Sequence, residues 1–116
     1  MSAPSFPVQA VSADVSVAPQ LEPTAMAEAA RAGFRSVINN RPDFEGGPSQ
    51  PTSASIEAAA VAAGLSYAYL PVNGAMQTPE QIARFAELLE ELPKPILAFC
   101  RSGARSGRLY QQATTG

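Results

Sequence analysis

Short apolar runs alternate along the chain with longer segments in which apolar residues recur every three or four positions. The short runs, bounded by glycine, proline and asparagine, have the length and spacing of buried strands. They predict strands at 15–17, 34–39, 66–70 and 96–99. The periodic segments predict helices at 23–33, 53–63, 79–92 and 105–114. Because strands and helices alternate, the predicted fold is a three-layer α/β sandwich with a mostly parallel central sheet covered on both faces.

The clearest helix signal begins at Thr78. Thr78 has the chemistry of an N-cap, Pro79 takes the first helical position, and Gln81 follows three residues after the cap, which is the pattern of a capping box. The apolar stripe of this helix consists of Ile82, Phe85, Leu89 and Leu92. Spacing of this kind predicts a face that packs against the core.

The first residues have a different character. Residues 1–12 are small and punctuated by proline, which predicts a flexible N-terminal lead-in with at most a short edge strand nearby. The alternating segment 15–17 is the candidate for that strand. A chain of 116 residues fits one domain, which we therefore assign to 13–116.

Charge argues against two classes of partner. The formal net charge is -2, and Lys94 is the single lysine, so no basic footprint for nucleic acid or for an anionic membrane surface is expected. No apolar stretch reaches the roughly 20 residues that span a bilayer, and the N-terminus lacks the pattern of a secretory signal. These features predict a cytoplasmic protein, and any anion site must be local.

The absence of histidine and the single cysteine exclude several mechanisms. There is no Ser-His or Cys-His pair, no histidine-ligated metal, no internal disulfide and no cysteine zinc cluster. We therefore expect no cofactor and no metal. Nucleophilic catalysis would need a thiolate that its surroundings activate.

Cys100 ends a strongly apolar run and opens a loop that leads into a helix. A strand that passes through a glycine-containing turn into a helix aims several N–H groups at one point, where the helix dipole favours negative charge. Such a place can lower a cysteine pKa from about 8.5 to roughly 3.5 to 7.5. Arg105 can hold an oxyanion with two hydrogen bonds. The alternative is a buried structural cysteine, but two arginines, two serines and a glycine in the next six residues favour a reactive thiol.

Three loops leave the carboxyl ends of the predicted strands, where α/β sheets bind ligands. They are 40–51, 71–77 and 100–106. The candidates for contact with substrate beside the thiolate are Arg41, Asp43, Glu45 and Asn73. Within the cysteine loop, Arg101 is a rim cation or a partner of a glutamate, Ser102 and Ala104 offer backbone N–H groups, and Gly103 serves a special backbone angle. Arg41 either reaches this pocket or ties its own loop down, and Asp43 either acts on substrate or forms a turn.

Three stretches together resemble one known family: Gly33 to Asp43, Tyr69 to Val72, and Cys100 to Ser106. The family is the phosphatase-like domain of the beta-lactamase-hydrolase-like proteins, which is similar in fold to the dual-specificity phosphatases. The resemblance runs from about residue 14 to 115. It implies that Cys100 attacks phosphorus, that Arg105 and the loop amides bind the phosphate oxygens, and that Ser106 eases departure of the thiolate. The implied substrate is a phosphate monoester, hydrolysed through a cysteinyl-phosphate intermediate.

The sequence also departs from the phosphatase pattern. Four residues, not five, separate Cys100 from Arg105; Phe99 replaces the usual histidine; and the 71–77 loop carries no carboxylate to act as general acid. Asp43 is the candidate to replace that acid. The short loop also resembles that of rhodaneses, which implies a sulfurtransferase that carries a persulfide on Cys100. A third interpretation is a module that binds an anion without turnover. The expected partner is thus a phosphate- or sulfur-bearing small anion or a phosphorylated substrate.

Overall fold

A computed structural model describes residues 4–115 of the chain. Its elements, in chain order, are β1 (Gln9–Ala10), β2 (Val15–Ala18), α1 (Ala25–Arg31), β3 (Ser36–Asn39), α2 (Ser53–Ala62), β4 (Ser66–Tyr69), α3 (Pro79–Glu91), β5 (Ile96–Phe99) and α4 (Ala104–Thr115). The helix at Thr78 begins as predicted, because both hydrogen bonds of the capping box are formed. Within residues 4–115, no helix is long and apolar enough to cross a bilayer.

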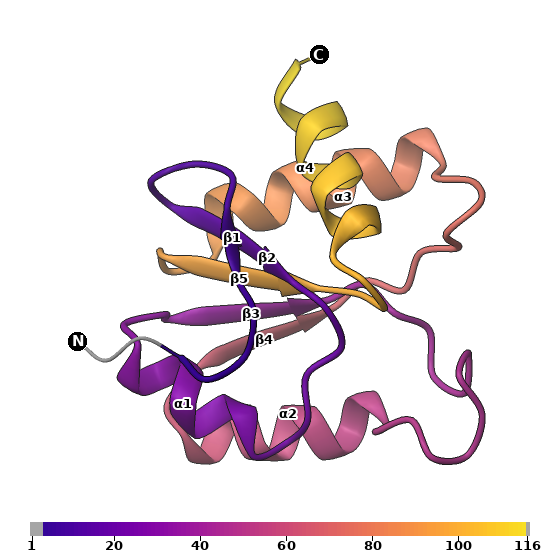
Figure 1. Cartoon of the computed structure of the whole chain (residues 1–116). Coiled ribbons are helices and arrows are strands. Elements are labelled where there is room, and N and C mark those ends of the chain that lie inside the picture. The colour runs from indigo at the N-terminus through magenta and orange to yellow at the C-terminus, as the bar shows by residue number, and fades with distance from the viewer. Residues whose placement is uncertain (1–3, 116) are drawn as a thin grey trace.

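The five strands form one sheet in the order β1-β2-β5-β3-β4. Strands β2, β5, β3 and β4 run parallel, and only β1 is antiparallel. The sheet separates α1 and α2 on one face from α3 and α4 on the other (Figure 1). The predicted three-layer α/β architecture with a mostly parallel sheet is therefore confirmed.

The two faces of the sheet carry separate apolar cores. Val37, Leu97 and Phe99 pack with residues of α1 and α2, whereas Ile38 and Ala98 pack with residues of α3 and α4. Neighbouring positions of one strand thus serve opposite faces, as strand geometry requires. Because β3 and β5 are buried on both faces, the strand that leads into Cys100 is rigidly held.

Two predictions for the N-terminal part are wrong. The described part of residues 1–12 is attached to the domain: β1 pairs with β2, Phe6 packs against the core, and the Ser5 N–H donates to Glu28 at 2.9 Å. The pairing of β1 with β2 crosses the assigned boundary at residue 13. The edge strand is β1, whereas the predicted edge strand lies one place further in. Apolar contacts of this segment overrode its proline-rich local pattern; residues 1–3 lie outside the described residues.

One position of the apolar stripe on α3 also differs. Leu88 is 4% exposed and belongs to the core, whereas Leu89 is only partly buried. The two positions lie about 100° apart around the helix, on either side of Phe85, and an apolar face is wide enough to include both.

Candidate active site

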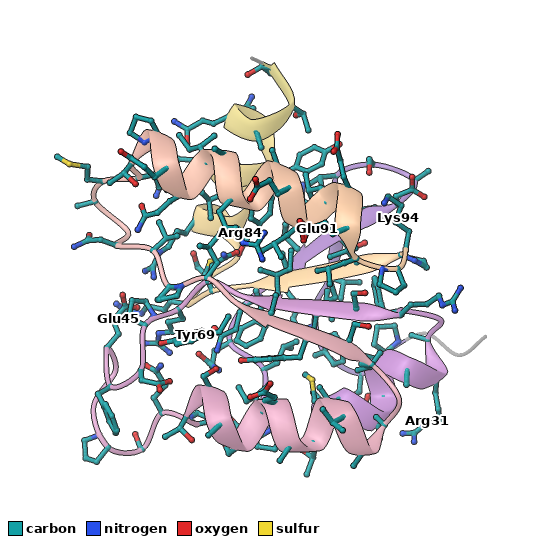
Figure 2. The ribbon with its side chains drawn as sticks, turned by 180° about the vertical axis from the view of Figure 1, so that it is seen from behind. Arg31, Glu45, Tyr69, Arg84, Glu91 and Lys94 are labelled. Atoms are coloured by element: carbon teal, nitrogen blue, oxygen red, sulfur yellow. The ribbon has the colours of Figure 1, made fainter. Side chains whose placement is uncertain are left out.

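The carboxyl ends of β3, β4 and β5 meet at one edge of the sheet, and their loops are bonded together there. The Asn40 N–H donates to the Phe99 carbonyl at 2.8 Å, and the Val72 N–H donates to the Asn40 carbonyl at 3.0 Å. Arg105 reaches across to the Val72 carbonyl at 3.0 Å. Figure 2 shows Glu45 and Tyr69 at this edge, with Arg31 and Lys94 at the opposite one. The three predicted loops therefore converge.

Cys100 lies at the base of this convergence and is 1% exposed. The Gly103 N–H donates to its sulfur at 3.0 Å. Burial by itself raises the pKa of the thiol, but hydrogen bonds from the Ser106 N–H and hydroxyl and from the Gly103 and Ser102 N–H groups outweigh it and leave the pKa lowered. The thiol is thus buried among donors, which is the environment of a thiolate.

The loop backbone explains how these donors come together. Gly103 has φ +95°, a left-handed conformation that L side chains rarely adopt, and α4 begins at the next residue. The turn brings the first N–H groups of the helix toward the sulfur. The Ala104 N–H is taken by the Ser102 hydroxyl at 3.3 Å, so Ala104 is not among the donors to Cys100. Arg101 is exposed, and its carbonyl accepts the Gln20 N–H at 3.2 Å.

Arg105 is held by a carboxylate from another loop. Its NH1 and NH2 groups donate to the two oxygens of Glu45 at 3.1 and 3.2 Å. Arg41 donates from Nε to the same carboxylate at 2.9 Å. Burial raises the pKa of Glu45, but the two guanidinium groups together hold it below its ordinary value. One carboxylate shared by two arginines leaves the cluster with a surplus positive charge, which favours an anion.

One nitrogen of Arg105, Nε, makes no hydrogen bond among the described residues. It is also buried. A buried donor without a partner costs free energy unless a ligand uses it. Glu45 holds NH1 and NH2 of this guanidinium, so Nε is the donor that remains for a ligand.

Two predicted contact residues serve their own loops. The Asp43 carboxylate accepts the Ser53 N–H at 2.7 Å at the start of α2, and its own N–H donates to the Tyr69 hydroxyl at 2.8 Å. The Asn73 side chain accepts the Ala75 N–H at 2.8 Å. The structure brings Glu45 and Arg41 to Arg105, and it gives Asp43 and Asn73 these local partners instead.

Asn40 was missed by the sequence analysis. It is fully buried, and its Oδ1 accepts the Ser106 hydroxyl at 2.8 Å. Its neighbour Asn39 uses Oδ1 to accept the Arg41 N–H at 2.9 Å. The signal was available in the sequence: two consecutive asparagines at the end of a buried strand need partners for their amides.

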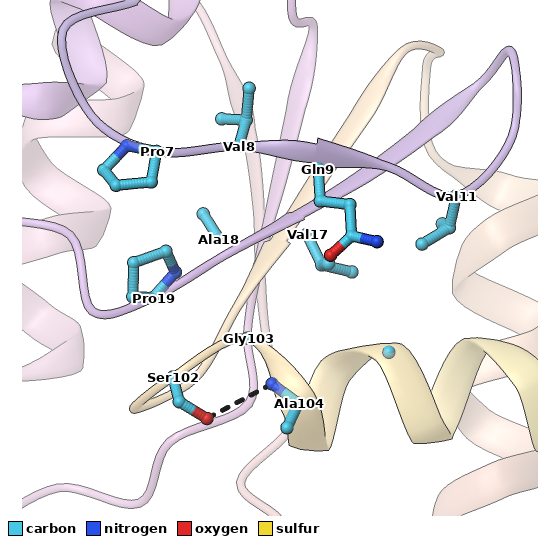
Figure 3. A pocket seen from close by; sticks show the side chains of 11 residues that line it. Pro7, Val8, Gln9, Val11, Val17, Ala18, Pro19, Ser102, Gly103 and Ala104 are labelled. Atoms are coloured by element: carbon cyan, nitrogen blue, oxygen red, sulfur yellow. Dashed lines mark hydrogen bonds between the residues drawn. The ribbon is translucent and has the colours of Figure 1, made fainter.

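A groove of about 550 Å³ lies beside the cysteine loop (Figure 3). It is lined by Ser102, Gly103 and Ala104 on one side and by residues of β1 and β2 on the other. Neither Cys100 nor Arg105 lines it, so this groove lies next to the cluster of Cys100, Arg105 and Glu45 and is distinct from it. Among residues 4–115, no group of three or more histidine, cysteine, aspartate or glutamate side chains could hold a metal ion.

The three-layer α/β fold with its mostly parallel sheet is shared with solved structures of the tyrosine and dual-specificity phosphatase class. The comparison with known proteins gives the particular family. Residues 7–116 match the family described as beta-lactamase hydrolase-like protein, phosphatase-like domain, and the chain belongs to that family.

Curated relatives share this name and are much longer. The beta-lactamase hydrolase-like protein of Agrobacterium fabrum is 41% identical over 78 residues, which is 67% of this chain and 18% of the relative. That of Xylella fastidiosa is 42% identical over 81 residues, 70% of this chain and 19% of the relative. The chain thus spans about a fifth of the length of these relatives.

Solved structures with the same fold are phosphatase-like. A proposed phosphatase from Neisseria meningitidis superposes with a TM-score of 0.81 and 29% identity, covering 88% of this chain and 72% of that one. A proposed phosphatase from Shewanella putrefaciens gives a TM-score of 0.78 and 20% identity, covering 91% and 68%. The TpbA protein of P. aeruginosa, solved with phosphotyrosine, gives 0.64 and 16%, covering 94% and 62%. The last two likenesses concern the fold alone.

Proposed function

We propose that this domain is a cysteine-dependent phosphatase that hydrolyses a phosphate monoester through a cysteinyl-phosphate intermediate. The observation that carries the proposal is the buried Cys100, whose sulfur accepts the Gly103 N–H at 3.0 Å and whose pKa is lowered by hydrogen bonds that outweigh the effect of burial. On the same loop, Arg105 is oriented by Glu45, and its Nε–H has no partner among residues 4–115. A nucleophile and an oxyanion clamp thus stand on one short loop.

The reaction has two displacements at phosphorus. The Cys100 thiolate attacks phosphorus, the bond to the ester oxygen breaks, and the leaving group departs with the electron pair as an alkoxide or phenolate, which takes a proton from solvent. Water then attacks the cysteinyl phosphate, the sulfur–phosphorus bond breaks to give back the thiolate, the proton of the water passes to solvent, and inorganic phosphate forms. In the second step Ser106 donates a hydrogen bond to the departing thiolate, which stabilises its charge.

The leaving group sets the expected substrate preference. The loop 71–77 has no carboxylate. The carboxylate of Asp43, the candidate general acid, accepts a hydrogen bond from the Ser53 N–H at the start of α2. Proton donation to a leaving group contributes typically 10² to 10⁴ in rate, roughly speaking. Aryl phosphates, whose leaving groups need little protonation, are therefore the favoured substrates. For alkyl phosphates to react, Asp43 would have to leave the Ser53 N–H and protonate the leaving oxygen.

Sulfur transfer is the second candidate, favoured by a separate observation. The donors of the loop converge on the sulfur of Cys100 itself, and four residues separate it from Arg105. A small ring of this kind suits the outer sulfur of a persulfide. Anion binding without turnover is the third candidate, supported by the Nε–H of Arg105, which has no partner among the described residues. A cytoplasmic location, where a free thiol stays reduced, forms part of the proposal.

The deciding experiment compares wild-type protein with Cys100→Ser. We expect the wild type to hydrolyse an aryl phosphate, vanadate to inhibit it, and the variant to be inactive. A wild-type rate equal to that of the variant would rule out the phosphatase. Incubation with thiosulfate distinguishes sulfur transfer, because one added sulfur on Cys100 is expected only for that chemistry. Stabilisation by phosphate that is lost in Arg105→Ala, without turnover, would identify a binding module.

A further inference from the structure

The segment that contains Cys100 and α4 is strongly basic. Residues 100–115 include Arg101, Arg105 and Arg108 and no aspartate or glutamate. The loop 71–77, which is bonded to this segment, has no ionisable side chain. Because the whole chain has a formal net charge of -2, this surplus of positive charge is local. A local surplus attracts anions to one part of the surface.

Arg108 is an arginine to which the proposed chemistry gives no role. It lies three residues after Arg105 on α4, and side chains with this spacing are neighbours on one face of a helix. Its NH2 group donates to the Gly74 carbonyl at 3.0 Å, on the loop after β4. Arg108 is exposed, so a solute can reach it.

Gly74 brings the two guanidinium groups together. A Cβ added to Gly74 would be 2.9 Å from NH2 of Arg105, and the carbonyl of the same glycine accepts the hydrogen bond from Arg108. Both cations therefore lie against one residue. Like charges at such short range repel each other, and an anion bound beside them relieves the repulsion.

The nearby carboxylates do not compensate the charge of Arg108. Glu45 pairs with Arg105 and with Arg41. Among residues 4–115, no carboxylate lies within ion-pair distance of Arg108, and this includes Glu80, the first carboxylate after the loop 71–77. The site thus has one arginine that a carboxylate orients and a second, on the same face of α4, whose charge is uncompensated.

We propose that Arg108 is a specificity-determining residue that binds a second anionic group, carried by the leaving group of the substrate, while Arg105 holds the phosphate that is cleaved. The substrate class is then an aryl phosphate whose ring carries a further negatively charged substituent. Arg108 forms only charged hydrogen bonds to that substituent, and no covalent bond changes there. The inference rests on the proposed function, because it names the substrate class of the same site.

The test compares two substrates that differ in one charged group: para-nitrophenyl phosphate and its analogue with a carboxylate on the ring, meta to the phosphate. The measured quantity is the ratio of kcat/KM for the carboxylated substrate to kcat/KM for the parent. The intrinsic reactivities cancel when this ratio is compared between variants. In Arg108→Gln the ratio should fall roughly three- to tenfold, because an exposed charged contact is worth less than a buried one. Arg108→Lys keeps the charge and should retain more of the ratio than Arg108→Gln.

The matched control is Arg84→Gln. Arg84 is an exposed arginine of α3 that pairs with Glu87 and Glu91. Its replacement removes the same charge from the chain and should keep the wild-type ratio. The wild-type ratio should also fall as the ionic strength rises, because salt screens the contact with Arg108. This second measurement needs no variant, so it tests the inference even if Arg108→Gln does not fold.

Equal losses for both substrates in Arg108→Gln would overturn the inference, because Arg108 would then only tie the loop 71–77 through Gly74. A ratio that is independent of salt and of Arg108 would overturn it as well. Either result with an active wild type counts against Arg108 alone. A wild type that hydrolyses neither substrate counts against the proposed phosphatase itself, and the inferred substrate class falls with it.

Discussion

At the scale of single residues, the site depends on one carboxylate that two arginines share. Glu45 fixes the guanidinium of Arg105 through both of its oxygens and also binds Arg41. Arg105 is thereby pre-oriented before any anion arrives, which lowers the entropy cost of binding. Glu45 acts through Arg105 and is therefore a positioning residue.

Replacing Glu45 tests this role. In Glu45→Gln the ion pairs are lost and Arg105 can rotate, so kcat/KM for an aryl phosphate should fall about ten- to a hundredfold, the worth of a charged hydrogen bond. The matched control is Glu87→Gln on α3, whose partner Arg84 is exposed, and it should keep wild-type activity. Equal activity of both variants would contradict the positioning role.

Glu45 also gives a pH dependence of stability. The two arginines lower its pKa in the folded state despite burial. A carboxyl with a lowered folded pKa stabilises the fold at pH values above its unfolded pKa of about 4.3, and this contribution is lost as the pH falls through the folded pKa. Urea unfolding should therefore show a steeper acid loss of stability in wild type than in Glu45→Gln. Parallel curves would contradict the assignment.

At the scale of elements, the site is formed by loops that follow the strands. Close contacts between glycines and arginine side chains hold these loops in place. Gly74, on the loop after β4, lies against Arg105, so that a Cβ added there would be 2.9 Å from NH2. The glycine thus makes room for the guanidinium. Similarly, a Cβ at Gly46 would be 2.6 Å from NH2 of Arg41.

Gly74→Ala should displace Arg105 with little effect on the fold. We expect kcat/KM to fall by roughly tenfold to a hundredfold, because small misplacements of a clamp are costly, while the urea midpoint changes little. Gly107→Ala in α4 is the matched control, since its Cβ meets nothing within 4 Å and alanine favours a helix by about 1 kcal/mol. Full activity in Gly74→Ala would show that Arg105 tolerates the displacement.

At the scale of the whole molecule, the site depends on a sheet with a separate core on each face. Phe85 of α3 is fully buried in one core, whereas Phe44, on the loop after β3, is 67% exposed. Phe85→Ala should lower the free energy of unfolding by about 3 to 5 kcal/mol, and Phe44→Ala should change it by less than about 0.5 kcal/mol. Chemical denaturation measures both, and similar losses would contradict the assignment of the core.

The features that could be predicted from the sequence are those that depend on local patterns. The strand before Cys100, the capping box at Thr78 and the convergence of three loops follow from short-range periodicity and from the rules of parallel sheets. Contacts between distant residues do not. Asn40 and Ser106 are 66 positions apart, and Arg105 and Glu45 are 60 apart. The direction of the Asp43 carboxylate and the pairing of β1 likewise depend on neighbours that only the fold supplies.

The central claim is that the Cys100 thiolate is a nucleophile toward phosphorus. Rapid quenching of the wild-type protein during turnover of an aryl phosphate, followed by mass spectrometry of the peptide that contains Cys100, tests it most directly. We predict one phosphoryl group on Cys100 in wild type and none in Cys100→Ser. Turnover without a phosphorylated cysteine, or equal labelling of the variant, would contradict the account.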